Sequence, residues 1–217
     1  MGRRFVDQRR RDPYYRAAQR EGLRSRASFK LAYLDDRFHL LRPGARVLDL
    51  GAAPGGWSVV ALERVGPRGI VVAVDPRPIA PAPGLRVVRG RVGDVKLLER
   101  LPPEPFDVVF SDMSPAISGA YSTDHARSVE LVHLAHALAL EVLAPNGAFV
   151  AKVFAGDMVD TLLAELRPNF AEVVRTKPPA SRAPSSEVYL VARGFRRASP
   201  SPGGSLSRTA ARPASDI

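Results

Sequence analysis

The chain has 217 residues, of which 45% are hydrophobic, and this suits one compact domain with a sizeable core. It contains no cysteine, which excludes disulfides and thiolate metal sites. No apolar run approaches the length that spans a bilayer, and the N-terminus lacks the apolar stretch of a secretory signal. We therefore expect a monomeric, cytoplasmic protein that does not enter a membrane.

The net charge of +10 comes from the two ends of the chain. Residues 1–26 carry nine arginines against three acids and residues 193–217 carry five against one, whereas residues 27–192 hold eighteen basic and eighteen acidic side chains. Such flanks are typical of segments that bind phosphate groups, although they can also serve only solubility. We expect a basic arm that contacts RNA over 1–26, a folded domain over 27–195, and a disordered Ser/Pro/Gly/Arg tail over 196–217.

The first predicted element is a helix over residues 28–41. Its apolar residues have helical spacing and form one side, with Lys30 off that side. The members of the apolar side are Phe29, Leu31, Leu34, Phe38 and Leu41.

Short β-rich runs then alternate with helical patterns. Seven strands are predicted, over residues 46–50, 70–74, 85–88, 107–110, 148–154, 171–176 and 188–192, and further helices over 57–65, 123–143 and 158–166. This alternation predicts an α/β fold with a mostly parallel seven-stranded sheet and helices on both faces. Three prolines, at 178, 179 and 184, leave no room for a last helix, so the final two strands are expected to form an antiparallel hairpin at one edge.

Residues 47–57 have the strand, tight turn and helix start of a nucleotide-binding half. Gly51, Gly55 and Gly56 let the backbone approach a ligand, and the following helix offers free N–H groups to an anion such as a methionine carboxylate. Trp57 opens that helix. Pro54 removes a backbone donor where a pyrophosphate would need one, which disfavours a dinucleotide cofactor.

Asp75 ends the second predicted strand, where a carboxylate can accept hydrogen bonds from both ribose hydroxyls of an adenosine. The turn together with Asp75 therefore fits S-adenosylmethionine better than NAD. Asp49, inside an apolar strand, is either a satisfied buried acid or a group that reaches the ammonium end of the cofactor.

Four charged residues are candidates for the chemistry. Asp112 follows a buried strand and is expected beside the cofactor's sulfonium group, whereas Lys152 interrupts an apolar strand and so needs a carboxylate partner, either Asp112 or Glu187. A lysine in a water-poor pocket can take the proton of an attacking hydroxyl. Lys30 and Glu187 complete the set as a pair that holds a ribose. No third ligand accompanies His133 and His136, so no metal site is predicted.

Together these residues resemble the FtsJ family, also called RrmJ or RlmE, of bacterial methyltransferases that act on ribose 2′-hydroxyl groups of large-subunit ribosomal RNA. The resemblance covers about residues 23–193 and rests on stretches that agree in identity and spacing. These stretches are 25–31, 49–58, 111–115, 152–154, 181–183 and 187–189.

The resemblance implies a Rossmann-like S-adenosylmethionine-dependent methyltransferase fold and roles for individual residues. Lys152 matches the proton acceptor, Asp112 and Glu187 match its electrostatic partners, and Lys30 matches a cation that positions the substrate. Matches to the family's cofactor contacts occur at Gly55, Trp57, Asp75 and Asp112.

One departure concerns the adenine end of the expected cofactor site. Where the family usually has an aspartate near the adenine, this chain has Arg91, with Asp94 three residues later. We expect Asp94 to contribute to cofactor binding, but either residue could meet the adenine.

The resemblance further implies a uridine of 23S rRNA as target, on the assembled 50S subunit. Two alternatives stay open on the sequence alone. The first is a 2′-O-methyltransferase acting on tRNA or an mRNA cap. The second is a nonenzymatic ribosome-assembly factor that uses the fold to bind RNA.

Overall fold

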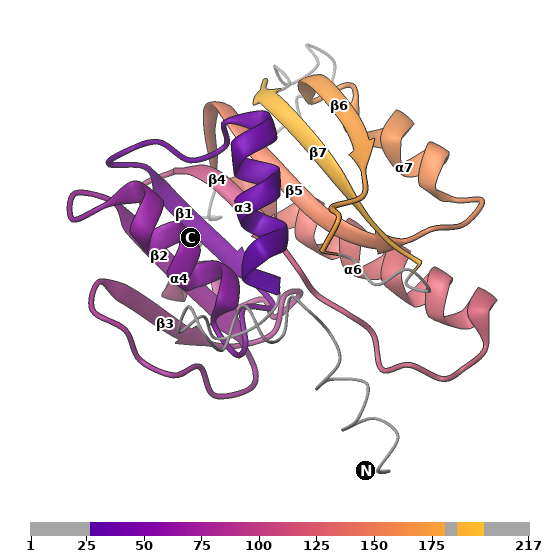
Figure 1. Ribbon diagram of the computed structural model, residues 1–217, viewed down its shortest axis with the longest axis horizontal. Coiled ribbons are helices and arrows are strands. Elements are labelled where there is room, and N and C mark those ends of the chain that lie inside the picture. The colour runs from indigo at the N-terminus through magenta and orange to yellow at the C-terminus, as the bar shows by residue number, and fades with distance from the viewer. Residues whose placement is uncertain (1–26, 181–185, 198–217) are drawn as a thin grey trace, which may run out of the picture.

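A computed structural model of the protein describes residues 27–180 and 186–197. Within them a single sheet has the strand order β3-β2-β1-β4-β5-β7-β6 (Figure 1). Its strands are β1 Arg46–Leu50, β2 Ile70–Asp75, β3 Leu85–Arg89, β4 Phe106–Ser111, β5 Leu143–Phe154, β6 Phe170–Thr176 and β7 Glu187–Phe195. The predicted seven-stranded α/β fold is thus confirmed.

The last two strands pair in antiparallel fashion, as predicted, but β7 is not at the edge of the sheet. It lies between β5 and β6 and is antiparallel to both, through seven residue pairs with β5 from Ala148↔Arg193 to Phe154↔Glu187. The inner position follows from its composition, because an apolar strand such as Tyr189 to Ala192 is completely buried only between two neighbours. As a result, Glu187 meets the end of β5 rather than solvent at an edge.

Five helices accompany the described strands: α3 Ala27–Phe38, α4 Gly56–Val65, α5 Leu97–Arg100, α6 Tyr121–Val142 and α7 Val159–Leu166. The short helix α5 was not predicted. Helix α3 ends at Phe38, three residues before its predicted end, where His39 adopts a left-handed backbone conformation with φ 50°. Helix α6 begins at Tyr121, two residues before its predicted start, and no described helix is long and apolar enough to cross a membrane.

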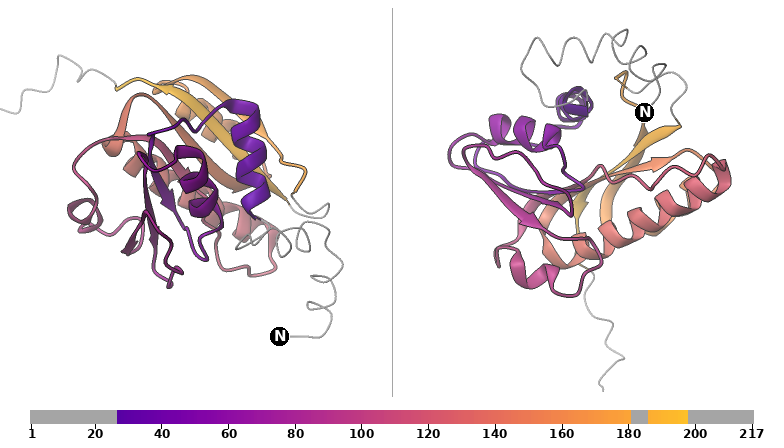
Figure 2. Two further views of the ribbon diagram at one scale, coloured as in Figure 1. Left: turned by 60° about the vertical axis from the view of Figure 1, so that its left-hand side comes forward. Right: turned by 90° about the horizontal axis from the view of Figure 1, so that it is seen from below.

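Helices cover both faces of the sheet and create two hydrophobic cores (Figure 2). Along β1, Val47 faces the core under α3 and α4, whereas Leu48 and Leu50 face the core under α6 and α7. This alternation is what the period of two of a strand dictates when both faces are buried.

The carboxyl ends of the parallel strands meet at one edge, and the strand order reverses between β1 and β4. In open sheets of this kind a ligand crevice forms at such a reversal. The segments 1–26, 181–185 and 198–217 lie outside the described residues, and so do the expectations for the basic arm and most of the tail.

Candidate active site

The glycine turn after β1 is built as a ligand-facing loop. The amides of Gly51 and Ala52 both donate to the Val74 carbonyl oxygen, at 2.9 and 3.2 Å, which ties the turn to β2. Gly51 has a φ of 73°, and a Cβ there would lie 2.6 Å from Met113 Cγ. Gly55, with a φ of 101°, precedes the first residue of α4. Only glycine suits these conformations without strain, so the turn brings its backbone close to whatever occupies the crevice.

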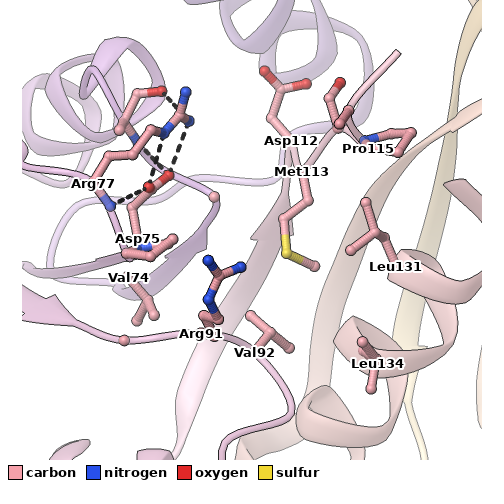
Figure 3. A pocket seen from close by; sticks show the side chains of 16 residues that line it. Val74, Asp75, Arg77, Arg91, Val92, Asp112, Met113, Pro115, Leu131 and Leu134 are labelled. Carbon is pink, nitrogen blue, oxygen red and sulfur yellow. Dashed lines mark hydrogen bonds and ion pairs between the residues drawn. The ribbon is translucent and has the colours of Figure 1, made fainter. Parts of the chain in front are cut away.

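A cavity of about 590 Å³ opens beside this turn, within the range of small-molecule sites. Its walls come from the ends of β1, β2, β3 and β4 and from α6 (Figure 3). Three expected cofactor residues, Gly51, Asp75 and Asp112, line it. The other lining residues are Ala53, Val74, Pro76, Arg77, Gly90, Arg91, Val92, Met113, Ser114, Pro115, Ala116, Leu131 and Leu134.

Trp57 does not line this cavity, because its side chain belongs to the core. The ring is 2% exposed, stacks on Tyr189 with 5.6 Å between centroids, and meets Phe110 edge-on. Its Nε1 donates to the Ala27 carbonyl oxygen at 2.9 Å. Trp57 therefore fastens the start of α3 to the sheet, and any ligand contact it makes is through its main chain. Gly55 and Gly56 are likewise absent from the lining.

Asp75 presents its carboxylate at the cavity wall, where protein donors surround it. Oδ2 accepts from the Ala53 amide at 3.0 Å, and Arg77 donates to both oxygens, at 3.1 and 3.2 Å (Figure 3). Burial acts to raise the pKa of Asp75, but the hydrogen bonds from Arg77 and from the Ala53 amide, together with the charge of Arg77, outweigh burial, and the pKa lies below its usual value. The Arg77 side chain is 70% exposed.

Of the two residues that the sequence offered for the adenine end, Arg91 lines the cavity and Asp94 does not. Figure 3 shows the Arg91 guanidinium group pointing into the space between Val74 and Met113. Asp94 instead closes the turn before α5, where its Oδ1 accepts from the Lys96 amide at 3.1 Å. This local hydrogen bond holds the Asp94 side chain in its own loop, and its contribution to cofactor binding stays a prediction.

Asp49 is completely buried between β1 and α4. Ser58 donates to its Oδ2 at 2.6 Å, while Oδ1 has no hydrogen-bond partner among the described residues. Burial raises the pKa of Asp49 to about 7, against the smaller opposing effect of the Ser58 hydrogen bond. An acceptor without a partner under the glycine turn suits a bound water or an ammonium group of a ligand.

Lys152 pairs with Asp112, which lines the cavity, although Lys152 itself is not among the lining residues. Lys152 is 6% exposed, and its Nζ lies 3.1 Å from Asp112 Oδ1 and donates to the Asp112 carbonyl oxygen at 2.9 Å. The pairing resolves the sequence alternative in favour of Asp112 over Glu187. An ammonium group has three N–H donors, and two of those of Lys152 point to the carbonyl oxygen and Oδ1 of Asp112. The third can serve another acceptor.

Glu187 pairs instead with Lys30, whose Nζ lies 2.5 Å from Glu187 Oε2. Lys30 was expected off the apolar side of α3, but it is only 5% exposed and lies on the buried side with Leu34 and Phe38. The pair joins the N-terminal helix to the strand that follows the proline-rich connection. The four predicted residues thus assemble as two lysine–carboxylate pairs.

Tyr189, which sequence reasoning missed, lies between the two pairs. Its hydroxyl donates to Asp112 Oδ1 at 2.9 Å. Lys30 Nζ lies over its ring, 5.5 Å from the centroid, in a cation–π contact. Tyr189 also pairs directly with Lys152 in the β5–β7 register. The signal in the sequence was the spacing of two from Glu187, because alternate residues of a strand share a face.

The two helical histidines lie away from this site. His133 Nε2 is 2.8 Å from Glu165 Oε2 at the surface, and the His136 ring packs near Phe149 and Phe170. Burial lowers the pKa of His136 below its usual value.

The fold agrees with comparisons against known proteins. The family model described as FtsJ-like methyltransferase matches residues 23–195. The chain belongs to this family. It is 50% identical over 196 residues to ribosomal RNA large subunit methyltransferase E of Paramagnetospirillum magneticum, a match that covers 87% of this chain and 80% of the relative. The expected enzyme class, a methyltransferase, is thereby confirmed.

Relatives of the same name occur in archaea, and a solved structure shares the fold. Identity to ribosomal RNA large subunit methyltransferase E of Methanothermobacter thermautotrophicus is 45% over 201 residues, covering 90% of this chain and 95% of that one. The crystal structure of a Plasmodium falciparum protein named as a ribosomal RNA methyltransferase superposes with a TM-score of 0.71 at 29% identity. It covers 79% of this chain and 98% of the Plasmodium chain.

Proposed function

We propose that this methyltransferase uses S-adenosylmethionine to methylate the ribose 2′-hydroxyl of a uridine in large-subunit 23S rRNA, on the assembled 50S subunit. The observation that carries the proposal is the buried Lys152 amine, which is held by Asp112, a residue that lines the cavity beside the glycine turn. Proteins named ribosomal RNA large subunit methyltransferase E, at 45–50% identity, support the substrate class.

The residues around the cavity fit S-adenosylmethionine. Asp75 offers two carboxylate oxygens of the kind that accept ribose hydroxyls, and apolar walls formed by Val74, Val92 and Leu131 suit an adenine. Asp49 Oδ1 has no hydrogen-bond partner among the described residues and could accept a hydrogen bond from a cationic group of the cofactor. When bound, this cofactor supplies an electrophilic methyl group on a positively charged sulfur.

Lys152 would act as general base in its neutral form. It would take the proton of the 2′-hydroxyl as that oxygen attacks the methyl group, which the bound cofactor would supply. The proton remains on Lys152, where Asp112 stabilises the resulting positive charge at 3.1 Å. Tyr189 fixes the Asp112 carboxylate through its hydroxyl, so the acceptor amine stays oriented.

Lys30 and Glu187 would orient the substrate beside this base. The carboxylate of this pair is partly accessible, since Glu187 is 22% exposed. A charged pair of this kind can donate to one ribose or phosphate oxygen and accept from a neighbouring hydroxyl.

The substrate is tested by offering radiolabelled S-adenosylmethionine with unmethylated 50S subunits, free 23S rRNA or tRNA, followed by mapping of the labelled nucleotide. We expect label on a uridine ribose of 50S subunits. Label on tRNA would identify tRNA as the substrate instead, and no label on any of these RNAs would favour the nonenzymatic assembly factor.

Replacing Lys152 tests the chemistry. Lys152→Ala is expected to lower the rate about 100-fold or more, because the general base is lost, while the cofactor Kd stays unchanged. Lys152→Arg keeps the charge but cannot accept a proton, so it is expected to be equally slow. Single-turnover rates and calorimetric binding measure both.

Lys96→Ala, an exposed lysine on the same domain, is the matched control and should keep full activity. A folded Lys152→Ala protein with the wild-type rate would remove the base role. An active Lys152→Arg protein would reduce that role to charge alone.

A further inference from the structure

Tyr121, the first residue of α6, is an exposed aromatic ring that is nevertheless held in place. Its side chain is 61% exposed. Its hydroxyl donates to the Ala155 carbonyl oxygen, and its ring stacks on the His125 ring with 11° between the planes. A ring anchored at its hydroxyl and backed on one face has its other face available to a flat ligand.

His125 gives this ring a rigid backing. It is 4% exposed, and its Nδ1 donates to the Phe154 carbonyl oxygen at 2.9 Å, since a carbonyl can only accept. A Cβ on Gly156 would lie 2.4 Å from His125 Cε1, so the segment after β5 passes the imidazole at close range. The Met158 amide and the Asp157 carboxylate face Nε2 at 3.4 and 3.3 Å. The two rings are therefore fixed to the segment that follows the strand of Lys152.

The ring pair lies at the same sheet edge as the reacting groups. Ala155 follows Lys152 by three residues, which along a strand is roughly 10 Å. The segment that leaves Asp112 also ends here, because the Asp124 carboxylate holds the Ser118 amide at 2.8 Å. Both segments that follow the Lys152–Asp112 pair thus converge on the start of α6.

The residues around the Tyr121 ring form an apolar contact surface rather than a positively charged site for phosphate. Two further large apolar side chains on these segments are exposed, Ile117 at 67% and Met158 at 39%. The neighbouring charges have opposite signs, with Arg127 reaching the Ala116 carbonyl oxygen at 3.5 Å and Asp157 beside His125. Apolar rings without net positive charge suit the face of a nucleobase better than a phosphate.

We propose that Tyr121, backed by His125, is a stacking platform for an unpaired nucleobase of the RNA substrate, a few nucleotides from the ribose to be methylated. The proposal rests on the proposed function, because it takes RNA as the substrate. Exposed aromatic rings bind unpaired bases by stacking, and any base can stack because every base has a π-face. The platform would therefore add affinity and hold the target strand at the edge without selecting a base.

A fluorescent oligoribonucleotide tests stacking directly. The probe is a single-stranded oligouridylate carrying one 2-aminopurine, whose emission falls when it stacks. Wild type and Tyr121→Phe are expected to quench it, whereas Tyr121→Leu, which has similar bulk but no ring, is expected to lose the quenching and roughly 10-fold in affinity. The slope of affinity against salt should be the same for all, because no phosphate contact is removed.

Tyr33→Leu, the same change on α3, is the matched control and should quench like wild type. Equal quenching by Tyr121→Leu and wild type, or no quenching by wild type, would overturn the platform.

Methylation of unmethylated 50S subunits provides the second measurement. Tyr121→Leu is expected to raise KM for the subunits roughly 10-fold with the cofactor Kd unchanged, and Tyr121→Phe to keep the wild-type KM. A fall in kcat shared by both variants would assign Tyr121 only to holding Ala155 and would overturn the proposal. The quenching assay needs no methyl transfer, so a wild-type protein that methylates no RNA would refute the proposed function and leave the stacking result to stand by itself.

Discussion

Lys30, Lys152 and Asp49 are among the charged side chains near the carboxyl edge of the sheet that are almost completely buried. The two lysines are compensated by carboxylates at 2.5 and 3.1 Å. Asp49 has only a hydroxyl donor, Ser58, and its pKa is raised to about 7 because burial disfavours the charged form. The lysines thus have carboxylate partners, whereas burial favours the neutral form of the aspartate.

Asp49 makes folding stability depend on pH in a definite direction. Its folded pKa of about 7 lies above the ordinary value of 3.8, so the folded state holds the proton more tightly than the unfolded chain. Its stabilising contribution is complete below pH 4 and is lost as pH rises through 7. Asp49→Asn removes this dependence, and its free energy of unfolding relative to wild type should rise by on the order of 3 kcal/mol between pH 4 and pH 8.

Urea unfolding of both proteins across this pH range measures the difference. Asp36→Asn, an exposed aspartate beside Arg64, is the control and should follow the wild-type curve. Parallel curves for Asp49→Asn and wild type would show that the carboxyl is ionised in the folded state at neutral pH.

At the scale of elements, the turn between β1 and α4 depends on the loop that follows β4. Gly51 faces Met113, and the Asp112 amide donates to the Leu50 carbonyl oxygen at 3.2 Å. The glycine turn after β1 and the loop after β4, which contains Asp112, are therefore packed against each other. A change in one of these loops should be transmitted to the other.

Gly51→Ala tests this close packing. The new Cβ would meet Met113 Cγ at 2.6 Å and Met113 Cα at 3.0 Å, at a φ of 73° that disfavours alanine. We expect a loss of about 1–3 kcal/mol of stability and at least a 10-fold weaker cofactor Kd, because the turn must shift into the cavity. Thermal melts and calorimetric titration measure the two effects.

Gly44→Ala is a matched control for this change. Gly44 has a similar φ of 81°, but no atom lies within 4 Å of the position that a Cβ would occupy there. It should lose stability through backbone strain alone and bind the cofactor like wild type. Equal loss of cofactor affinity in both variants would contradict the contact with Met113.

At the scale of the whole molecule, charge and chemistry are divided between the flanks and the folded body. Residues 27–192 are neutral overall, whereas residues 1–26 carry a net charge of +6. The body supplies the cavity and the paired lysines. The N-terminal flank is the part of the sequence best suited to contact the phosphate backbone of a large RNA.

Deleting residues 1–26 is expected to weaken binding to 50S subunits and to flatten its dependence on salt by several units of slope, because arginine–phosphate contacts are lost. Cofactor affinity should not change. Filter binding across a series of salt concentrations would measure the slope. Deletion of residues 198–217, which carry two arginines and one acid, is the control, and equal slopes for the two deletions would exclude a special role of the arm.

The sequence determined the elements and their class. Strands such as Arg46–Leu50 and Phe106–Ser111 are short, apolar and followed by turn residues, so local pattern predicts both their existence and their parallel order. The boundaries predicted from the sequence were less exact: β5 begins at Leu143, whereas the prediction began it at residue 148. The chemical set Lys30, Asp112, Lys152 and Glu187 was also predictable, because charge inside an apolar run demands a partner.

Only the tertiary structure decided which partner each residue has. Lys152 pairs with Asp112 and Glu187 with Lys30 because β7 inserts between β5 and β6, a choice made by contacts remote in sequence. For the same reason Trp57 packs into the core and Arg91, not Asp94, faces the cavity. Periodicity along a chain is a local property, whereas side-chain direction at a sheet edge depends on packing between segments far apart in the chain.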